Sequence, residues 1–347
     1  MLNLFERDQL YILNTYKRNN LHIKKGSGAY LYDTHHQKYL DMYAGIAVSS
    51  LGHRHRRLNR AIKRQISKHA HLSNYFVSEP VVSLAEMLVK SSFGYQVFFT
   101  NSGTEAIEAS IKLVRKYGRT IHPDKTEIIT LSKSFHGRTM GALSLTGQPK
   151  YQAPFSPLLS GVIHVDRNDV DALNKVASEK TCAIYVEVIQ GEGGIEMLSE
   201  AFIEAIHVLQ QKHDILVVVD EIQTGIMRTG KMFAYMHTQL KPDLMTLAKS
   251  LGGGLPLGAL VVSKPLKDVL KPGDHGTTFG GNPVSAAAGL ETFKVLSDPF
   301  LQEQVLKTSE YLFSKLEAIK ASYGIIQAIR GKGLMIGVDV GSHAQDI

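Results

Sequence analysis

The feature that most constrains the fold is an unbroken apolar run, ILVVV at 215–219, that ends in the acid Asp220. Such a run is typical of a strand that is buried on both faces of a parallel sheet. Its acid would emerge at the carboxyl edge of the sheet, where open α/β sheets bind ligands. The run therefore predicts a layered α/β fold with a polar site at one edge of its sheet.

Similar short apolar runs recur along the chain, and helical patterns separate several of them. The runs lie at 96–100, 127–131, 161–165, 183–189, 244–248 and 258–263, and the helical patterns include 105–117 and 200–213. Strands that alternate with helices favour a large, mostly parallel sheet with helices on both faces. The predicted fold class is therefore α/β.

The two ends of the chain follow a different pattern. Residues 21–48 alternate and turn as a small β-meander does, whereas the tail from about residue 292 is first helical and then strand-like at 332–340. A length of 347 residues suits one large α/β domain with a smaller partner. We expect a large domain at 50–290 and a smaller α+β domain built from 1–49 and 291–347.

A second apolar run, LMTLA at 244–248, is followed by Lys249, which lies at the start of a predicted glycine-rich turn. An acid and a lysine at neighbouring strand ends suit pyridoxal phosphate (PLP), because one side chain holds the pyridinium nitrogen and the other forms the Schiff base. Asp220 and Lys249 are thus candidate catalytic residues. A simple ion pair, or two solvated turn residues, would produce the same pattern.

Segment 98–110 has the pattern of a strand, a tight turn and the start of a helix. Ser102 and Glu105 have the spacing of a capping box, and Gly103 lets the backbone approach a ligand closely. The exposed N–H groups at 103–105 would face a phosphate, helped by the helix dipole. An ordinary capped helix is the alternative interpretation.

The motif SFHGRT at 134–139 places Phe135 and Arg138 in a turn after another strand. Phe135 could stack on a pyridine ring, and Arg138 could bind a substrate carboxylate through two parallel hydrogen bonds. Taken alone, an ordinary surface turn explains both residues. His136 between them has no role that the sequence assigns.

Two glycine-rich segments add further polar candidates. Glu187 and Glu192 flank a turn at a strand end, either as a switchable ion-pair partner for Arg138 or as plain turn residues. Thr277 and Thr278 lie in a polar stretch without apolar periodicity. Their hydroxyl groups are candidate donors to a phosphate.

Composition and charge argue against several other functions. The excess of seven positive charges is dispersed, apart from a cluster at 53–65 on a predicted amphipathic helix that places Leu58, Ile62 and Ile66 on one side. A solvated helix face explains this cluster better than a nucleic-acid site does. The close histidine pairs lack the helical i, i+4 spacing of a zinc-binding helix, and no cysteine accompanies them. We therefore expect no metal site.

The cellular location follows from features that the sequence lacks. The single cysteine, Cys182, excludes an internal disulfide framework, and the N-terminus has no continuous apolar segment of a secretory signal. No apolar run approaches the length of a membrane span. We expect a cytoplasmic protein that binds neither membrane nor nucleic acid.

Seven motifs occur in one order along the chain: NSGTEA, SFHGRT, QGEGG, VDEIQTG, RTG, AKSLGGGLPLGA and TTFGGNP. With this set the chain resembles the class III PLP-dependent aminotransferases, almost from end to end. The resemblance implies PLP-dependent transferase fold type I and a homodimer with shared active sites. The cofactor-binding residues that it implies are Ser102, Gly103, Thr104, Phe135, Asp220, Gln223, Lys249 and, from the second subunit, Thr278.

The resemblance also implies roles for individual residues. Gln223 would bond the phenolic oxygen of the cofactor ring, and Lys249 would move the proton between substrate and cofactor. Arg138 would bind the α-carboxylate of the substrate, with Glu192 as a gatekeeping acid nearby. Ile46 and Tyr16 are further substrate-binding residues by the same resemblance.

The segments YAGIAVSSLGH and RGKGLMIGVDV favour the acetylornithine branch of this family, and Ile46 stands where ornithine δ-aminotransferases typically carry a tyrosine. The implied reaction is ping-pong transamination of N2-acetyl-L-ornithine with 2-oxoglutarate, which gives N-acetylglutamate 5-semialdehyde and L-glutamate in arginine biosynthesis. The alternatives are an ornithine or 4-aminobutyrate aminotransferase, an aminomutase of the same fold, and a truncated, inactive PLP-binding homologue.

The chain departs from the family pattern in three places. Val188 stands where the family usually has proline, and Met227 replaces a frequent glycine. The family also continues beyond residue 347, in a segment that carries an arginine credited with binding the glutamate α-carboxylate. The resemblance therefore implies a weakened glutamate half-reaction for this chain.

Overall fold

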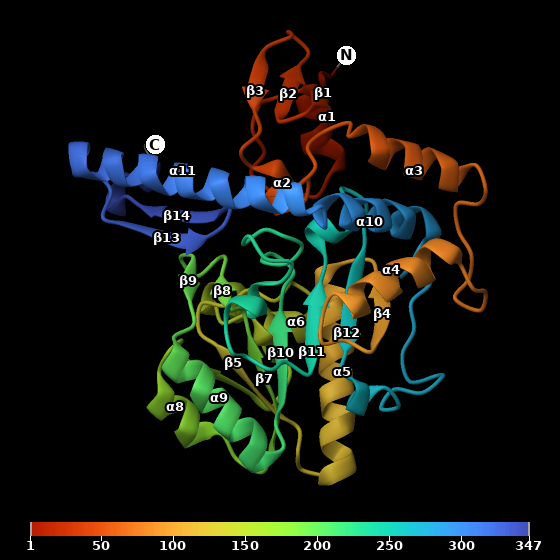
Figure 1. The fold of residues 1–347 in the computed structure, drawn as a ribbon, viewed down its shortest axis with the longest axis vertical. Helices are drawn as coiled ribbons and strands as arrows, with labels where there is room; N and C mark the ends of the chain where they lie inside the picture. Colours follow the sequence, from red (N-terminus) through yellow and green to blue (C-terminus); the bar gives the residue numbers. More distant parts are fainter. Residues whose placement is uncertain (1, 346–347) are drawn as a thin grey trace.

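The computed structural model describes residues 2–345, and its centre is a seven-stranded sheet in the order β4-β12-β11-β10-β7-β5-β6 (Figure 1). The strands are β4 Gln96–Thr100, β5 Glu127–Leu131, β6 Val162–Val165, β7 Thr181–Val186, β10 Leu216–Asp220, β11 Leu244–Leu247 and β12 Gly258–Val262. Every apolar run predicted as a strand between residues 96 and 263 contributes to this sheet.

Among the described strands of this sheet, β12 alone runs against its neighbours. Strands β6, β5, β7, β10 and β11 pair in parallel, whereas β12 is antiparallel to both β11 and β4. The segment between β11 and β12 is too short for the helical crossover that joins parallel strands. The prediction of a largely parallel sheet is confirmed, and β12 is its one exception.

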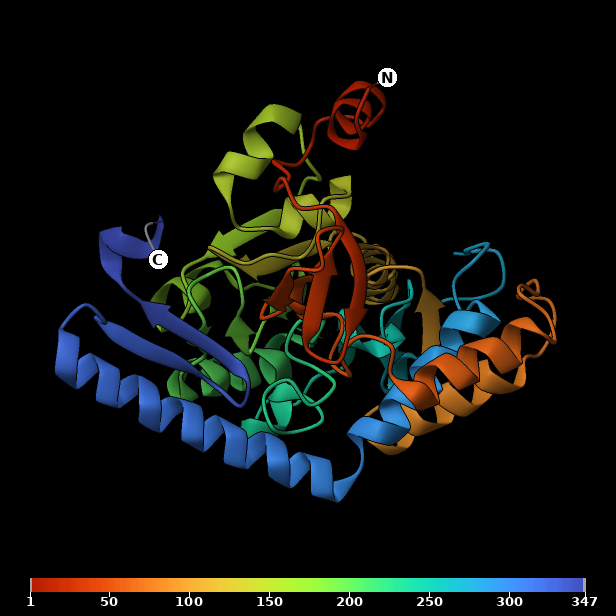
Figure 2. The same cartoon turned by 90° about the horizontal axis from the view of Figure 1, so that it is seen from above.

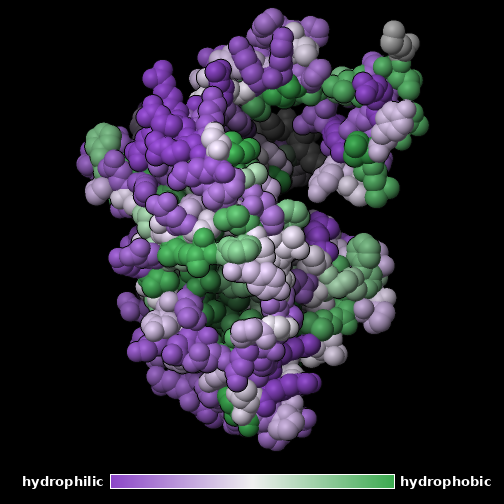
Figure 3. All heavy atoms as spheres, turned by 90° about the vertical axis from the view of Figure 1, so that its right-hand side faces the viewer, coloured by the Kyte–Doolittle hydropathy of each residue, from purple (hydrophilic) through white to green (hydrophobic). Residues whose placement is uncertain are grey.

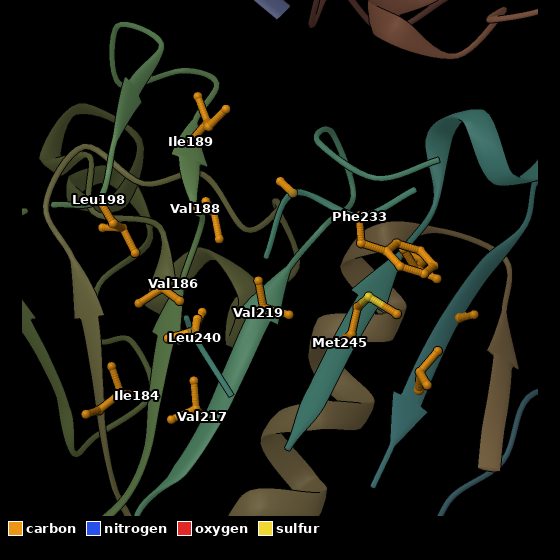
Figure 4. Packing of buried hydrophobic residues seen from close by; sticks show 14 of the residues in the cluster. Ile184, Val186, Val188, Ile189, Leu198, Val217, Val219, Phe233, Leu240 and Met245 are labelled. Carbon is orange, nitrogen blue, oxygen red and sulfur yellow. The ribbon is translucent and has the colours of Figure 1, made fainter. Parts of the chain in front are cut away.

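Helices cover both faces of the sheet, as predicted. On one face α5 Gly103–Ile121 and α6 Met140–Leu145 share a hydrophobic cluster with the sheet, and on the other face α4 Glu79–Lys90, α8 Val170–Val176, α9 Glu200–His213 and α10 Pro283–Leu296 form a larger one. Alternate residues of β10 supply the two clusters. Val217 and Val219 pack with the α9 side (Figure 4), and Leu216 and Val218 with the α5 side. Burial on both faces explains why this strand is apolar without alternation.

The remaining elements are shorter or lie at the ends of the chain. The other helices are α1 Leu4–Tyr11, α2 Ala44–Ala47, α3 Arg56–Ile66, α7 Pro149–Gln152 and α11 Pro299–Tyr323, with 3-10 helices at Ala153–Phe155, Ala234–His237, Lys249–Gly252, Lys264–Leu266 and Gly341–Gln345. The other strands are β1 Ile23–Ser27, β2 Tyr30–Asp33, β3 Lys38–Leu40, β8 Ile189–Gln190, β9 Glu196–Met197, β13 Ala328–Lys332 and β14 Met335–Asp339.

The two ends of the chain lie on the side of the sheet toward which the carboxyl ends of the parallel strands point (Figure 1). Strands β1, β2 and β3 form the predicted antiparallel meander, and β13 and β14 form a hairpin. Seen from above, the meander lies over the centre of the molecule and α11 runs along one edge (Figure 2). The two end segments form separate sheets, and their grouping into one small domain stays a prediction.

The structure corrects two local predictions. The meander does not continue to residue 48, because β3 ends at Leu40 and Ala44–Ala47 forms a tight turn with positive φ at Ile46. Ile66, predicted on the apolar side of α3, is exposed because the helix ends at this residue.

Candidate active site

Asp220 is the last residue of β10 and is only 4% exposed. Its Oδ2 lies 2.7 Å from Nδ1 of His136, and its Oδ1 accepts hydrogen bonds from the backbone of Ile222 at 3.0 Å and from Oγ1 of Thr246 at 3.2 Å. Thr246 belongs to the neighbouring strand β11, where it pairs with Asp220 in register. The acid is therefore held at the carboxyl edge by partners from three segments.

Lys249 follows β11 by two residues and begins a 3-10 helix with a positive φ of 45°. Burial lowers the pKa of its amino group, and the carboxylates of Asp220, Glu192 and Glu187 oppose this shift only in part. An amine with a lowered pKa is neutral, and hence nucleophilic, at a lower pH than an exposed lysine.

One cavity of about 470 Å³ joins these two residues. The predicted residues that line it are Ser102, Gly103, Thr104, Phe135, Arg138, Glu187, Glu192, Asp220, Gln223 and Lys249. They come from the ends of β4, β5, β7, β10 and β11 and from the loops that follow. The topology of the sheet thus brings together residues that are far apart in the sequence.

The N-terminus of α5 forms one wall of the cavity. Ser102 is the N-cap residue and accepts a hydrogen bond from the backbone of Glu105 at 3.3 Å. The Glu105 carboxylate accepts from the backbone of Asn101 at 2.6 Å, one residue before the position that a capping box uses. At Gly103 a Cβ atom would lie 2.7 Å from Cδ1 of Ile222, so a larger residue here would require the Ile222 side chain to shift. The free N–H groups and the helix dipole make this wall suitable for an anion.

Arg138 and Phe135 lie together with a third residue that the sequence did not single out. The guanidinium carbon of Arg138 is 3.6 Å from the centre of the Tyr151 ring and 5.5 Å from that of Phe135. No carboxylate within residues 2–345 forms an ion pair with Arg138, and its side chain is exposed. Stacking on the Tyr151 ring therefore orients the guanidinium of Arg138, which remains available to bind a carboxylate ligand.

His136 is the main polar residue of the site whose role the sequence did not indicate. It is buried, and burial alone would lower its pKa, but the hydrogen bond and the charge of Asp220 raise the pKa overall. Its backbone N–H donates to Oγ1 of Thr146 at 2.9 Å, and its Nε2 is buried without a partner. A histidine beside two predicted site residues was the only sequence signal for this contact, because the acid that it meets lies 84 residues away.

Two buried carboxyl groups near Asp220 have raised pKa values. Burial is the first cause for both, and it raises the pKa of Glu187 and of Glu221 to about 7. Glu187 lines the cavity and accepts from the backbone of Phe135 at 3.1 Å. Glu221 instead accepts from the backbone at Ala234 and Tyr235, so it holds a loop rather than a ligand.

Thr277 and three other predicted residues do not line this cavity. Tyr16 is 73% exposed and lies in a separate hollow of the N-terminal segment, between α1 and β1. Ile46 is exposed in the tight turn, two residues before Val48, which does line the cavity. Thr278 is exposed on the loop before α10. The proposed roles of these three residues stay predictions.

The chemistry of the lining fits PLP. Asp220 can pair with a protonated ring nitrogen, Lys249 offers an amine to an aldehyde, and the N-terminus of α5 offers N–H groups to a phosphate. Within residues 2–345, no group of three or more histidine, cysteine, aspartate or glutamate side chains is arranged to hold a metal ion. No helix of the same residues is both long and apolar enough to cross a membrane.

A sheet covered on both faces, with an acid and a lysine at neighbouring strand ends, is the architecture of fold type I of the PLP-dependent enzymes. The model of the aminotransferase class-III family matches residues 12–347. The chain belongs to this family.

Relatives of known sequence and structure agree with this assignment. The chain is 47% identical to an acetylornithine aminotransferase of Caldanaerobacter subterraneus subsp. tengcongensis, over 96% of this chain and 85% of that protein. It is 40% identical to an acetylornithine aminotransferase of Methanocaldococcus jannaschii, over 99% of this chain and 87% of that one. Among solved structures it resembles the ornithine aminotransferase of Toxoplasma gondii, at 33% identity and a TM-score of 0.92 over 98% of this chain and 82% of that one. The N-acetylornithine aminotransferase of Stenotrophomonas maltophilia gives 34% identity and a TM-score of 0.83 over 98% of this chain and 84% of that one.

Proposed function

We propose that this chain transfers the terminal amino group of N-acetylornithine to 2-oxoglutarate with PLP as cofactor. The observation that carries the proposal is the meeting of Lys249, Asp220 and Arg138 at one cavity. The first two residues provide an amine and its electrostatic partner for the cofactor, and the third provides a site for a substrate carboxylate. The names of the relatives at 40–47% identity favour N-acetylornithine as the amino donor.

We assign the parts of the cofactor to the walls of the cavity. Ser102, Gly103 and Thr104 would bind the phosphate at the N-terminus of α5, because N–H groups and the helix dipole favour an anion there. Phe135 would cover one face of the ring, and Gln223 would bond its hydroxyl oxygen. When bound, PLP supplies an aldehyde that takes up the amino group and a ring that withdraws electrons from the reacting carbon.

Lys249 and Asp220 would perform the proton chemistry. Burial lowers the pKa of Lys249 and so favours its neutral amine, whose Nζ would remove a proton from the substrate carbon that bears the amino group. Asp220, held by His136 and Thr246, keeps a negative charge in place for the ring nitrogen. The burial of both residues strengthens this electrostatic effect by excluding water.

Arg138 and Glu192 would select the substrate. The exposed guanidinium of Arg138 would bind the α-carboxylate of N-acetylornithine, which leaves the far amino group to reach Lys249. Glu192 lines the same cavity and would act as the gatekeeping acid. Ile46 and Tyr16 would contact parts of the substrate that extend beyond the residues lining the cavity.

A homodimer with shared sites is part of the proposal. Thr278 is exposed and does not line its own cavity, and Thr278 of the partner subunit would complete each phosphate site. Exposed apolar side chains lie on this loop and on the segment that Asn74 ties to it, namely Tyr75, Phe76, Val77 and Phe279, which we call the apolar patch. Figure 3 shows apolar surface gathered across the middle of the face on the right of Figure 1, between more hydrophilic regions above and below. Burial of such a patch against a second copy would stabilise a dimer.

The test is a comparison of amino donors with the purified protein and PLP. N-acetylornithine should convert the bound cofactor to its amino form, seen as a change in visible absorbance, at least about tenfold faster than ornithine or 4-aminobutyrate. Lys249→Ala should abolish this change. Turnover of a single substrate without 2-oxoglutarate would instead indicate an aminomutase, and a preference for ornithine would overturn the substrate assignment.

A further inference from the structure

Asn101 connects the phosphate end of the cavity to the loop that carries Thr278. It lines the cavity beside Ser102, and its backbone N–H donates to Oε2 of Glu105 at 2.6 Å. Its side-chain Nδ2 lies 3.2 Å from Oε1 of Glu105 and 3.3 Å from Oγ1 of Thr277. One side chain therefore joins the first turn of α5 to a segment 176 residues further along the chain.

Hydrogen bonds hold Thr277 at the start of a short exposed segment, Thr278 and Phe279, which we call the tip. Its carbonyl oxygen accepts from Nδ2 of Asn74 at 2.9 Å, and its Oγ1 also accepts from the backbone of Gly280 at 3.1 Å. Gly280 is buried, whereas Thr278 and Phe279 between these two anchors are exposed. The direction of the tip thus depends on hydrogen bonds at Thr277.

The geometry points to Asn101 as a positioning residue that couples the two active sites of a dimer. An anion at the N-terminus of α5 would fix the positions of residues 101–105. The hydrogen bond from Asn101 would then restrict the positions of Thr277 and of the tip. The tip would then complete the phosphate site of the partner subunit. This inference rests on the shared-site dimer of the proposed function.

The expected consequence is positive cooperativity in PLP binding. A first PLP orders the tip that the second site needs, so the second binding event requires less ordering. Coupling through one or two hydrogen bonds corresponds to about a threefold to tenfold increase in affinity for the second PLP. The coupling is carried by the phosphate, so pyridoxal without phosphate should bind without cooperativity.

The experiment is a titration of cofactor-free dimer with PLP, followed by absorbance. We expect a Hill coefficient above one for the wild type, below the limit of about two that two sites set. Thr277→Val removes the acceptor hydroxyl at nearly constant shape and should lower the coefficient to about one. The matched control Thr277→Ser keeps the hydroxyl and should keep the cooperativity. A non-cooperative wild type, or a cooperative Thr277→Val dimer, would overturn the inference.

Two further variants separate this inference from the proposed function and guard against misfolding. Asn101→Ala removes the donor side of the same contact, so it should reproduce the Thr277→Val result, and thermal unfolding of each cofactor-free variant checks the fold. Thr278→Ala should weaken PLP binding at every site. If Thr278→Ala leaves the PLP affinity unchanged, the shared-site dimer fails. If it weakens binding while Thr277→Val stays cooperative, only the coupling through Asn101 fails.

Discussion

At the scale of single residues, the contact between Asp220 and His136 has the most direct consequence for the chemistry of the site. The two side chains are buried and 2.7 Å apart, and the pKa of His136 is raised by its carboxylate partner. The hydrogen bond from His136 fixes the Asp220 carboxyl group beneath the ring that the cofactor would place there. The histidine therefore acts through the acid as a positioning residue.

Replacement of this histidine should reduce turnover more than substrate binding. His136→Asn retains a polar group but cannot carry the positive charge, so Asp220 loses a charge-assisted hydrogen bond. Such a bond is worth about 1.5–3 kcal/mol, which corresponds to a decrease in kcat of about tenfold to a hundredfold. We expect KM for the amino donor to change by less than about threefold. Steady-state kinetics across the pH range test this prediction, and an unchanged kcat would contradict it.

The raised pKa of Glu187 predicts a pH-dependent stability. Burial raises this pKa from 4.5 in the unfolded chain to about 7 in the folded protein. Between these pH values the folded protein binds a proton that the unfolded chain releases, so the free energy of unfolding falls as the pH rises toward 7. Glu187→Gln removes this titration. In cofactor-free protein we expect the variant to match the wild type near pH 4 and to exceed it by roughly 2–3 kcal/mol near pH 8.

Urea unfolding at the two pH values measures this difference. Glu204→Gln, which alters an exposed acid on α9, is the matched control and should give the same difference from wild type at both. An equal effect of Glu187→Gln at pH 4 and pH 8 would show that Glu187 does not hold the proton.

Among the secondary-structure elements, α5 has the most direct link between packing and the site. Its first turn forms the anion wall of the cavity, and its middle packs on the sheet through buried residues such as Ile107 and Val114. The helix approaches the sheet closely at Gly118, where a Cβ atom would lie 2.8 Å from Cβ of Cys182 and within contact of the Lys125 carbonyl. The position of the N-terminus of α5, which forms the wall suited to an anion, thus depends on a glycine more than three turns further along the helix.

Gly118→Ala should therefore destabilise the protein although alanine is the better helix former. The propensity gain of about 1 kcal/mol is smaller than the cost of moving two backbone segments apart, so we expect a net loss of about 1–3 kcal/mol. Denaturant unfolding measures the loss. Arg119→Ala, one residue further on the exposed side of α5, should change the free energy of unfolding by less than about 0.5 kcal/mol. An equally stable Gly118→Ala protein would mean that the helix shifts without strain.

For the whole molecule, the apolar patch beside Thr278 predicts association. Tyr75 is 95% exposed and Phe76 is 68% exposed, and Asn74 ties this segment to Thr277 at 2.9 Å. Phe76→Asp would place a charge in the proposed interface and should shift the protein from dimer toward monomer at micromolar concentration. Sedimentation velocity measures the change. Val208→Asp alters another exposed apolar residue, on α9, and should leave the dimer intact.

The sequence by itself determined the framework of this protein. The apolar runs predicted all seven strands of the main sheet, because residues that are buried on both faces must be apolar throughout. Local signals also placed Asp220 and Lys249 at neighbouring strand ends and Ser102 at the start of α5. These features depend on residues close together in the chain, and their physical cause, burial or capping, is visible in the residue types themselves.

The tertiary structure decided the features that depend on contacts between distant segments. The hydrogen bond between His136 and Asp220, the stacking of Arg138 on Tyr151, and the hydrogen bond from Asn101 to Thr277 each join residues whose proximity no local pattern encodes. The left-handed backbone at Ala44–Ala47 was likewise absent from the local residue pattern, which predicted a continuing meander. The pKa of Glu187 belongs to the same group, because desolvation is a property of the folded surroundings of a residue and not of its sequence.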